Sequence, residues 1–186
     1  MIGNSSARGL SGKVALVTGG SSGIGAATVQ ALANEGAVLV IGYHQGRERA
    51  ETLLKSLAGE GHQMLQLPLE DASAHAAAAE WMGTNFGKID VLVNSAGYTR
   101  RIAHHDLTTL DSALFNRILT ANAGGPFSIT RALMPLLRAS GDAVVVNVSS
   151  VSAFTGSGSN VAYCAAKAAL DTMTQSLARA FGPQVR

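Results

Sequence analysis

Short runs rich in valine, leucine and isoleucine alternate along this chain with longer runs of helix-forming residues. The apolar runs stand at 13–18, 37–41, 62–67, 89–93 and 143–148. Runs of this length with nearly continuous branched residues are typical of strands that are buried on both faces. Strands that alternate with helices form a parallel sheet covered by helices on both sides. The pattern therefore predicts an α/β fold with a doubly wound parallel sheet.

The helical runs carry boundary signals of their own. An alanine-rich run ends at Gly36, a residue that commonly stops a helix. Further helices are predicted at 47–58, 73–86, 108–138 and 160–181. Thr108 and the three residues after it fit a capping box, with Thr108 as the N-cap residue. The sequence Gly124-Gly125-Pro126 predicts a bend within the long fourth helix.

Length and composition exclude several classes of protein. The 186 residues are most simply one domain spanning 1–186, with residues 1–12 as a loose leader. A net charge of +2 without a basic cluster predicts no nucleic-acid partner. No apolar run reaches the length of a membrane-spanning helix, and the first residues lack a signal peptide. We therefore expect a cytoplasmic protein that does not bind membranes.

Few residues of this chain are suited to binding a metal ion. Cys164 is the only cysteine, which excludes an intramolecular disulfide and a cysteine-based metal site. His104 and His105 have no further ligand at the spacing of a metal site. We therefore expect no metal.

A glycine-rich turn links the first predicted strand to the first helix. It reads Gly19-x-x-x-Gly23-x-Gly25, with Ser21, Ser22 and Ile24 between the glycines. Glycines at such a turn let the backbone approach a pyrophosphate, which binds at the positive N-terminus of the following helix. The turn therefore favours a dinucleotide site, although a strand-to-helix turn without a ligand also uses glycine.

Tyr163 and Lys167 stand four positions apart in the last predicted helix, so both side chains project from the same face. Ser150 follows the last apolar run, where a small-residue loop can fold it back toward them. A free phenol titrates near pH ~10, but a cation about 4 Å away stabilises a phenolate by roughly 4 kcal/mol at an effective dielectric constant of ~20. We interpret Tyr163 as a general acid–base that Lys167 activates. Alone, such a pair also occurs in helices without catalytic function.

Several motifs in one fixed order make the sequence resemble the short-chain dehydrogenase/reductase family. The resemblance covers nearly the whole chain and is to the branch whose members have roughly 250 residues, a common domain size. It implies a Rossmann-type sheet with helices on both faces that lacks its last strands here. Ser95 stands where the family usually has a second asparagine. The matching positions are Thr18-Gly19-x-x-x-Gly23-x-Gly25, Asn94-Ser95-Ala96-Gly97, Asn122, Ser150, Tyr163 and Lys167.

The resemblance implies a role for each of these residues. Tyr163 protonates a carbonyl oxygen during reduction or deprotonates an alcohol during oxidation. Lys167 contacts the nicotinamide ribose, Ser150 orients the substrate oxygen, and Asn122 supports a water that relays protons to Lys167. The cofactor-binding residues that it implies are Gly19, Ser21, Ser22, Gly23, Ile24, Gly25, Asn94, Ala96, Gly97, Tyr163 and Lys167.

The end of the second strand discriminates between NAD and NADP, because a carboxylate there binds the ribose 2′-hydroxyl and a cation binds a 2′-phosphate. No acidic residue follows the strand directly, and Tyr43 takes the position where NAD-dependent members usually carry aspartate, so we expect Tyr43 to be a cofactor-binding residue. Arg47 is the favoured phosphate ligand, with His44 and Arg49 as lesser candidates, unless both arginines face solvent. Ser22 argues for NAD, because many NADP-dependent members have a basic residue there. The balance favours NADP.

Another departure from the family follows the third strand. Pro68 takes the place of an aspartate that contacts the adenine amino group in the family. Either Glu70 or Asp71 substitutes for that aspartate, or the contact is lost.

The resemblance predicts an NAD(P)-dependent oxidoreductase that interconverts a small-molecule carbonyl and a secondary alcohol. A 3-oxoacyl-thioester reductase and a sugar or polyol dehydrogenase both fit. The alternative is a non-catalytic dinucleotide-binding or regulatory fragment. Family members continue beyond the position of Arg186 into a substrate-covering segment and a final strand, so we expect a truncated sequence. The long fourth and fifth helices resemble the pair through which family members form homodimers and homotetramers.

Overall fold

The computed structural model describes residues 9–186. Residues 1–8 of the expected leader lie outside the described residues. The remaining leader residues, 9–12, form a turn in which the Leu10 N–H donates to the Glu35 carbonyl at 3.0 Å. This part of the leader is therefore tied to the end of the first helix.

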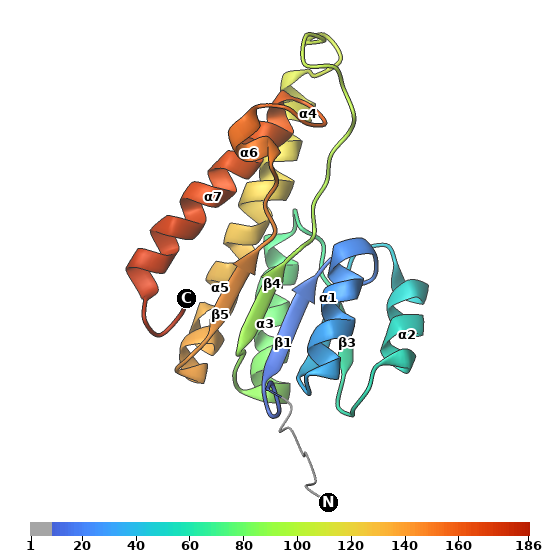
Figure 1. The fold of residues 1–186 in the computed structure, drawn as a ribbon, viewed down its shortest axis with the longest axis vertical. Coiled ribbons are helices and arrows are strands. Elements are labelled where there is room, and N and C mark those ends of the chain that lie inside the picture. The colour runs from blue at the N-terminus through green and yellow to red at the C-terminus, as the bar shows by residue number, and fades with distance from the viewer. Residues whose placement is uncertain (1–8) are drawn as a thin grey trace, which may run out of the picture.

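Within residues 9–186 the strands form one parallel sheet in the order β3-β2-β1-β4-β5. The order reverses direction on either side of β1, so a crevice opens between β1 and β4 at the carboxyl ends of the strands. This is the predicted doubly wound Rossmann-type arrangement (Figure 1). The strands are β1 (Val14–Thr18), β2 (Val38–Tyr43), β3 (Gln63–Gln66), β4 (Val91–Asn94) and β5 (Val144–Asn147).

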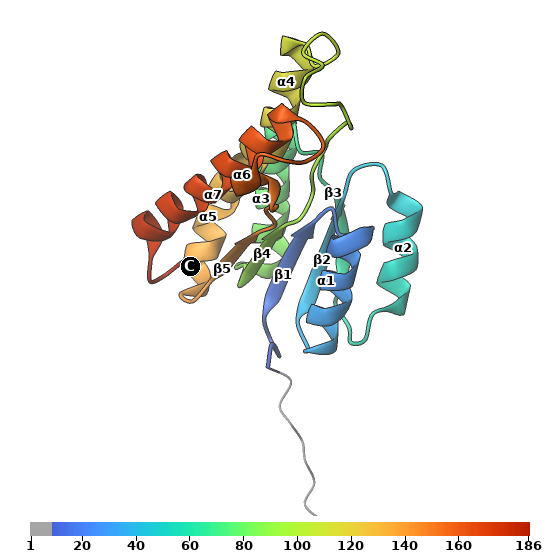
Figure 2. The same ribbon diagram turned by 45° about the horizontal axis from the view of Figure 1, so that its top comes forward.

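Helices cover both faces of the sheet, as Figures 1 and 2 show. On one face, α1 (Gly23–Asn34) and α2 (Arg47–Ser56) bury Ala15, Leu39 and Ile41. On the other face, α3 (Ala72–Phe86) and α5 (Gly125–Ser140) pack over Leu16 and Leu92. Because alternate residues of a strand point to opposite faces, each run of apolar residues supplies both cores.

Three further α-helices complete the fold of residues 9–186. They are α4 (Ser112–Leu119), the short α6 (Ser152–Thr155) and the long α7 (Val161–Phe181). A third apolar cluster joins α4 to α7, with Ile118 from α4 and Ala162 from α7 buried at its centre. None of the helices among residues 9–186 has the length and apolarity needed to cross a membrane.

The fourth helical run differs from the prediction in two ways. Its N-cap residue is Asp111, whose carboxylate accepts from the Leu114 N–H at 2.8 Å, so the predicted cap at Thr108 is wrong. An aspartate three residues further on offers a charged acceptor to the first turn, and the segment before it forms turns instead. A π-helical segment, Thr120–Gly124, separates α4 from α5 and ends at Gly124, the first residue of the predicted bend.

Candidate active site

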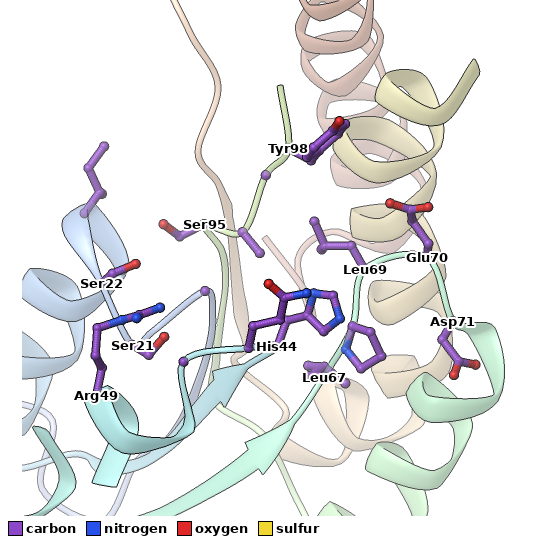
Figure 3. A pocket seen from close by; sticks show the side chains of 18 of the residues that line it. Ser21, Ser22, His44, Arg49, Leu67, Leu69, Glu70, Asp71, Ser95 and Tyr98 are labelled. Carbon is purple, nitrogen blue, oxygen red and sulfur yellow. The ribbon is translucent and has the colours of Figure 1, made fainter. Parts of the chain in front are cut away.

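A cleft of about 780 Å³ opens at the carboxyl ends of β1, β2, β3 and β4 (Figure 3). Its walls come from the turns that follow these four strands and from α4. The residues that line it are Gly19, Ser21, Ser22, Ile24, Gly25, His44, Gln45, Gly46, Arg49, Leu67, Pro68, Leu69, Glu70, Asp71, Ser95, Ala96, Gly97, Tyr98 and Arg117.

The glycine turn forms one wall because a side chain would not fit at its first and last glycine. Gly19 has a φ of +63°, and a Cβ there would lie 2.8 Å from the Ala96 Cα. A Cβ on Gly25 would collide with the Gly19 carbonyl. Ser22 is the N-cap residue of α1 and makes no side-chain capping hydrogen bond. The N–H groups of the first turn of α1 thus have no side-chain cap, and residues of this turn line the cleft, so the N-terminus of α1 can hold an anion there.

The turn after β2 brings a cation to the cleft at Arg49 rather than at Arg47. A Cβ on Gly46 would lie 2.5 Å from the Arg49 guanidinium and 2.6 Å from the Ser21 hydroxyl, so these groups converge on one point (Figure 3). His44 lines the cleft beside them. The predicted Arg47 does not line it, because its guanidinium pairs with Glu51 at 2.8 Å one helical turn away and 71% of its side chain is exposed.

Tyr43 also lies away from the cleft, contrary to the prediction. It is the last residue of β2, is 7% exposed and packs in the apolar core beneath α1 and α2. The strand runs two residues further than the apolar run at 37–41, because Tyr43 pairs with Gln66 of β3. His44 therefore becomes the first residue after the strand.

Both carboxylates after β3 have partners within the chain. Asp71 caps α3 by accepting from the Ser73 and Ala74 N–H groups at 2.9 and 3.1 Å. Glu70 pairs with Arg117 of α4 at 3.3 Å, and the Arg117 guanidinium lies 4.4 Å from the centre of the Tyr98 ring. Glu70 and Asp71 also line the cleft, so each carboxylate has a partner within the chain and stands at the cleft wall near Pro68.

The turn after β4 is held against β1 and against the π-helical segment. The Thr18 hydroxyl accepts from the Ser95 and Ala96 N–H groups, both at 3.1 Å. Asn122 is fully buried in the π-helical segment; its side chain donates to the Tyr98 carbonyl at 2.5 Å and accepts from the Tyr98 N–H at 3.3 Å. Asn94 donates from its side chain to Asn147 at 2.8 Å, so the ends of β4 and β5 are joined.

The first half of α7 carries Tyr163 and Lys167 on one face, as the spacing predicts. The Lys167 ammonium lies 5.7 Å from the centre of the Tyr163 ring. It is buried and donates to the Val148 carbonyl at 2.6 Å, which fixes it at the end of β5. Burial lowers the pKa of Lys167, and the nearby Asp171 carboxylate partly opposes this shift.

Ser150 follows β5 and is held by the short helix α6. Its hydroxyl donates to the Ser152 hydroxyl at 3.1 Å and accepts from the Ser152 N–H at the same distance. The sequence gives no helical signal for α6 beyond four small or apolar residues, and we did not predict it. Ser150 thus starts a turn that leads directly into the loop before Tyr163.

Tyr98 connects the cleft with Asn122 and Tyr163. It lines the cleft, bonds to Asn122 through both backbone groups, and packs with Tyr163 against the third apolar cluster. Tyr98 and Arg117 were not predicted as site residues, although Tyr98 is an aromatic residue directly after the turn at Gly97. Asn122, Ser150, Tyr163 and Lys167 are not among the residues that line the cleft; Asn122 and Tyr163 are linked to it through Tyr98.

The strand order and the cleft at the carboxyl ends of the strands define a class, the doubly wound α/β proteins of the Rossmann type. Residues 13–186 match the family described as short chain dehydrogenase. The chain belongs to this family.

Named relatives and solved structures agree with this assignment. D-threitol dehydrogenase of Mycolicibacterium smegmatis is 36% identical over 93% of this chain and 66% of its own length. The 3-oxoacyl-acyl-carrier-protein reductase of Escherichia coli is 34% identical over 90% of this chain and 67% of its own. A dehydrogenase/reductase structure from Sinorhizobium meliloti is 34% identical with a TM-score of 0.85, and covers 96% of this chain and 71% of that one. The chain spans about two thirds of the length of these two named relatives.

Proposed function

We propose that the protein interconverts a carbonyl and a secondary alcohol with NADP(H) as its preferred cofactor. The observation that carries this proposal is the placement of the buried Lys167 ammonium 5.7 Å from the Tyr163 ring. Tyr163 shares an apolar cluster with Tyr98, which lines a cleft that has the glycine turn in its wall. The proposal fits two named relatives, one a polyol dehydrogenase and one a 3-oxoacyl reductase. The substrate class follows from those relatives rather than from the cleft.

The residues around the cleft fit a nicotinamide dinucleotide phosphate. Side chains would fill the space at Gly19 and Gly25, so bare backbone is available to a pyrophosphate at the N-terminus of α1. Ser21 and Arg49 would hold a 2′-phosphate, with His44 beside them. No acidic side chain follows β2 directly to bind a 2′-hydroxyl. When bound, this cofactor supplies or accepts the hydride.

The remaining chemistry belongs to side chains of the chain. Tyr163 gives a proton to the carbonyl oxygen of the substrate in reduction and takes it back in oxidation. A charged Lys167 favours the phenolate form that this exchange requires. Ser150 donates a hydrogen bond to the same substrate oxygen, and Asn122 holds the Tyr98 backbone at the edge of the cleft. We assign these roles by resemblance and by position.

Replacement of Tyr163 by phenylalanine tests the proposal. Loss of a positioned general acid costs about 10²–10⁴-fold in rate, so kcat of Tyr163→Phe should fall by at least ~100-fold. NADPH oxidation is measured with a panel of ketones, ketoacyl thioesters and ketoses, and NADPH binding is measured in parallel by fluorescence. Binding should persist in the variant. Undiminished turnover in Tyr163→Phe would overturn the acid assignment, and tight NADPH binding without turnover in the unmodified protein would favour the non-catalytic alternative.

We also propose that the protein forms a homodimer or homotetramer through α5 and α7. A groove of about 470 Å³ lies between these helices and is lined largely by apolar side chains. Among them, Phe127 is 47% exposed. An exposed apolar groove of this kind is typical of a protein–protein interface.

A further inference from the structure

The residue directly before α7, Asn160, is fully buried although it is polar. Its side-chain oxygen accepts from the Tyr163 N–H at 2.8 Å and so caps the helix that carries Tyr163 and Lys167. Its side-chain nitrogen donates to the Arg100 carbonyl at 2.7 Å and to the Thr99 hydroxyl at 3.2 Å. One acceptor and both donor positions of this amide are therefore in use.

The segment that Asn160 holds is the one that Asn122 holds from the other side. Asn122 bonds to both backbone groups of Tyr98, and Asn160 bonds to the two residues that follow it. The three residues 98–100 are thus fixed between two buried asparagines from separate helical segments. Tyr98 also lines the cleft, so this arrangement relates α7 to the cleft through short links.

Further hydrogen bonds run along the same boundary. The Ile102 N–H donates to the Ser159 carbonyl at 2.8 Å, and the Thr99 and Ser159 hydroxyls lie 2.7 Å apart. His104 bonds to the Gly158 carbonyl at 3.2 Å. Unlike Asn160, Thr99 and Arg100 are exposed to solvent. Asn160 is therefore the buried centre of the contact between the loop after β4 and the loop before α7.

We propose that Asn160 is a positioning residue for Tyr163. It fixes the first turn of α7, and with it the Tyr163 side chain, against the segment 98–100 at the edge of the cleft. This inference rests on the proposed function, in which Tyr163 exchanges a proton with the substrate. A displacement of about 1 Å at a reacting group can cost ~100-fold in rate. Loss of these links should therefore lower kcat even where the melting temperature changes little.

The cap and the links can be separated by substitution. Serine caps helices about as well as asparagine but is too short to reach the Arg100 carbonyl, so Asn160→Ser keeps the cap and loses the links. Asn160→Asp also keeps an acceptor for the Tyr163 N–H and loses both donors. Asp111→Ser is the matched control, because it exchanges one good N-cap residue for another on α4.

The measurements are kcat, NADPH affinity, melting temperature and hydrogen exchange of the Ile102 N–H. In Asn160→Ser we expect kcat to fall about 10- to 100-fold with NADPH affinity within about twofold, and Ile102 to exchange faster. In Asp111→Ser, kcat should stay within about twofold at a similar melting temperature. Asn160→Asp replaces the serine variant if the latter does not fold, with the same expectation.

Two results would overturn the inference. One is faster Ile102 exchange with an unchanged kcat, which would make Asn160 structural only. The other is an equal loss of kcat in Asn160→Ser and Asp111→Ser. If the unmodified protein shows no turnover with any substrate, the proposed function fails first. Hydrogen exchange then tests the inference separately from the proposed function. Unchanged exchange at Ile102 in Asn160→Ser would show that the links do not hold the two loops together.

Discussion

Arg47 and Arg49 stand two positions apart, and that spacing places them on different sides of α2. Arg49 approaches Ser21 and Gly46 at the cleft, whereas Arg47 pairs with Glu51 in solvent. We predict that Arg49→Ala weakens NADPH binding about tenfold or more and leaves NADH binding unchanged, since a charge-assisted hydrogen bond is worth roughly 1.5–3 kcal/mol. Fluorescence titration with both cofactors measures the two affinities.

Arg47→Ala is the control for this prediction, because it removes the same charge from the same helix. It should change the affinity for either cofactor by less than about twofold, since exposed ion pairs contribute roughly 0–1 kcal/mol. Equal losses in the two variants would contradict the assignment of Arg49. A clear preference of the unmodified protein for NADH would contradict the choice of NADP.

Asp90 lies at the opposite end of the sheet from the cleft and is 2% exposed. Burial alone would raise the pKa of its carboxyl, but hydrogen bonds from the Val14 N–H, Ser140, Lys88 and Lys13 outweigh burial and lower the pKa to about 2. The stabilisation is complete above the ordinary value of 3.8 and is lost as the pH falls through about 2. That interval corresponds to roughly 2 kcal/mol of unfolding free energy.

Urea unfolding of the unmodified protein and of Asp90→Asn between about pH 5 and pH 2 tests this prediction. Over this interval the carboxyl of Asp90 takes up its proton, first in the unfolded chain and then in the folded protein. The unmodified protein should lose about 2 kcal/mol more than the variant over that range. Parallel acid dependence of the two proteins would show that the buried carboxylate does not contribute.

At the scale of elements, a buried histidine joins the turn after β3 to two helices. His75 of α3 is 2% exposed; its ring bonds to the Pro68 carbonyl at 2.9 Å and to the Ser128 hydroxyl of α5 at 2.8 Å. Burial lowers the pKa of His75 below 6.5, while the Pro68 bond and the Asp71 charge partly oppose this. Because the unfolded chain takes up the proton first, stability is complete above pH 6.5 and falls as the pH drops below it.

We therefore predict a loss of stability on mild acidification that His75→Gln reduces. Melting temperatures measured in steps from neutral pH to about pH 5 would record it, since the unfolded imidazole titrates near ~6.5. His105 is exposed, so His105→Gln should keep the acid dependence of the unmodified protein. A variant at His75 with unchanged acid dependence would rule out this histidine as the cause.

Elements with strong local signals were predictable from sequence, and those set by contacts were not. The apolar runs and the spacing of Tyr163 and Lys167 are local patterns, and the parallel sheet follows from their alternation. The end of β2 depends on pairing with β3, which carried the strand on to Tyr43 and changed the residues that reach the cleft. The π-helical segment at Asn122 has no local signal except the glycines after it, and π-helical turns occur often at functional sites.

At the scale of the whole molecule, the groove between α5 and α7 predicts self-association. Phe127 is an exposed aromatic residue in this groove, and Phe154 of α6 is an exposed aromatic residue outside it. Light scattering should find dimers or tetramers in the unmodified protein, smaller species in Phe127→Lys, and no change in Phe154→Lys, because a buried lysine charge opposes an apolar contact. A monomer at every concentration would refute the prediction.

The order of strands has a consequence for synthesis of the chain. The middle strand, β1, is synthesised first, but one of its edges pairs with β4. Thr18 therefore cannot pair with Asn94 until Asn94 has emerged from the ribosome. Pairing between such distant segments is slow, and the nascent chain carries one open edge of β1 meanwhile. Gly19 packs against Ala96, so the nucleotide site that we propose is incomplete on a ribosome-bound chain that lacks Ala96. The proposed cofactor can therefore stabilise the finished domain, but it cannot guide the first stage of its folding.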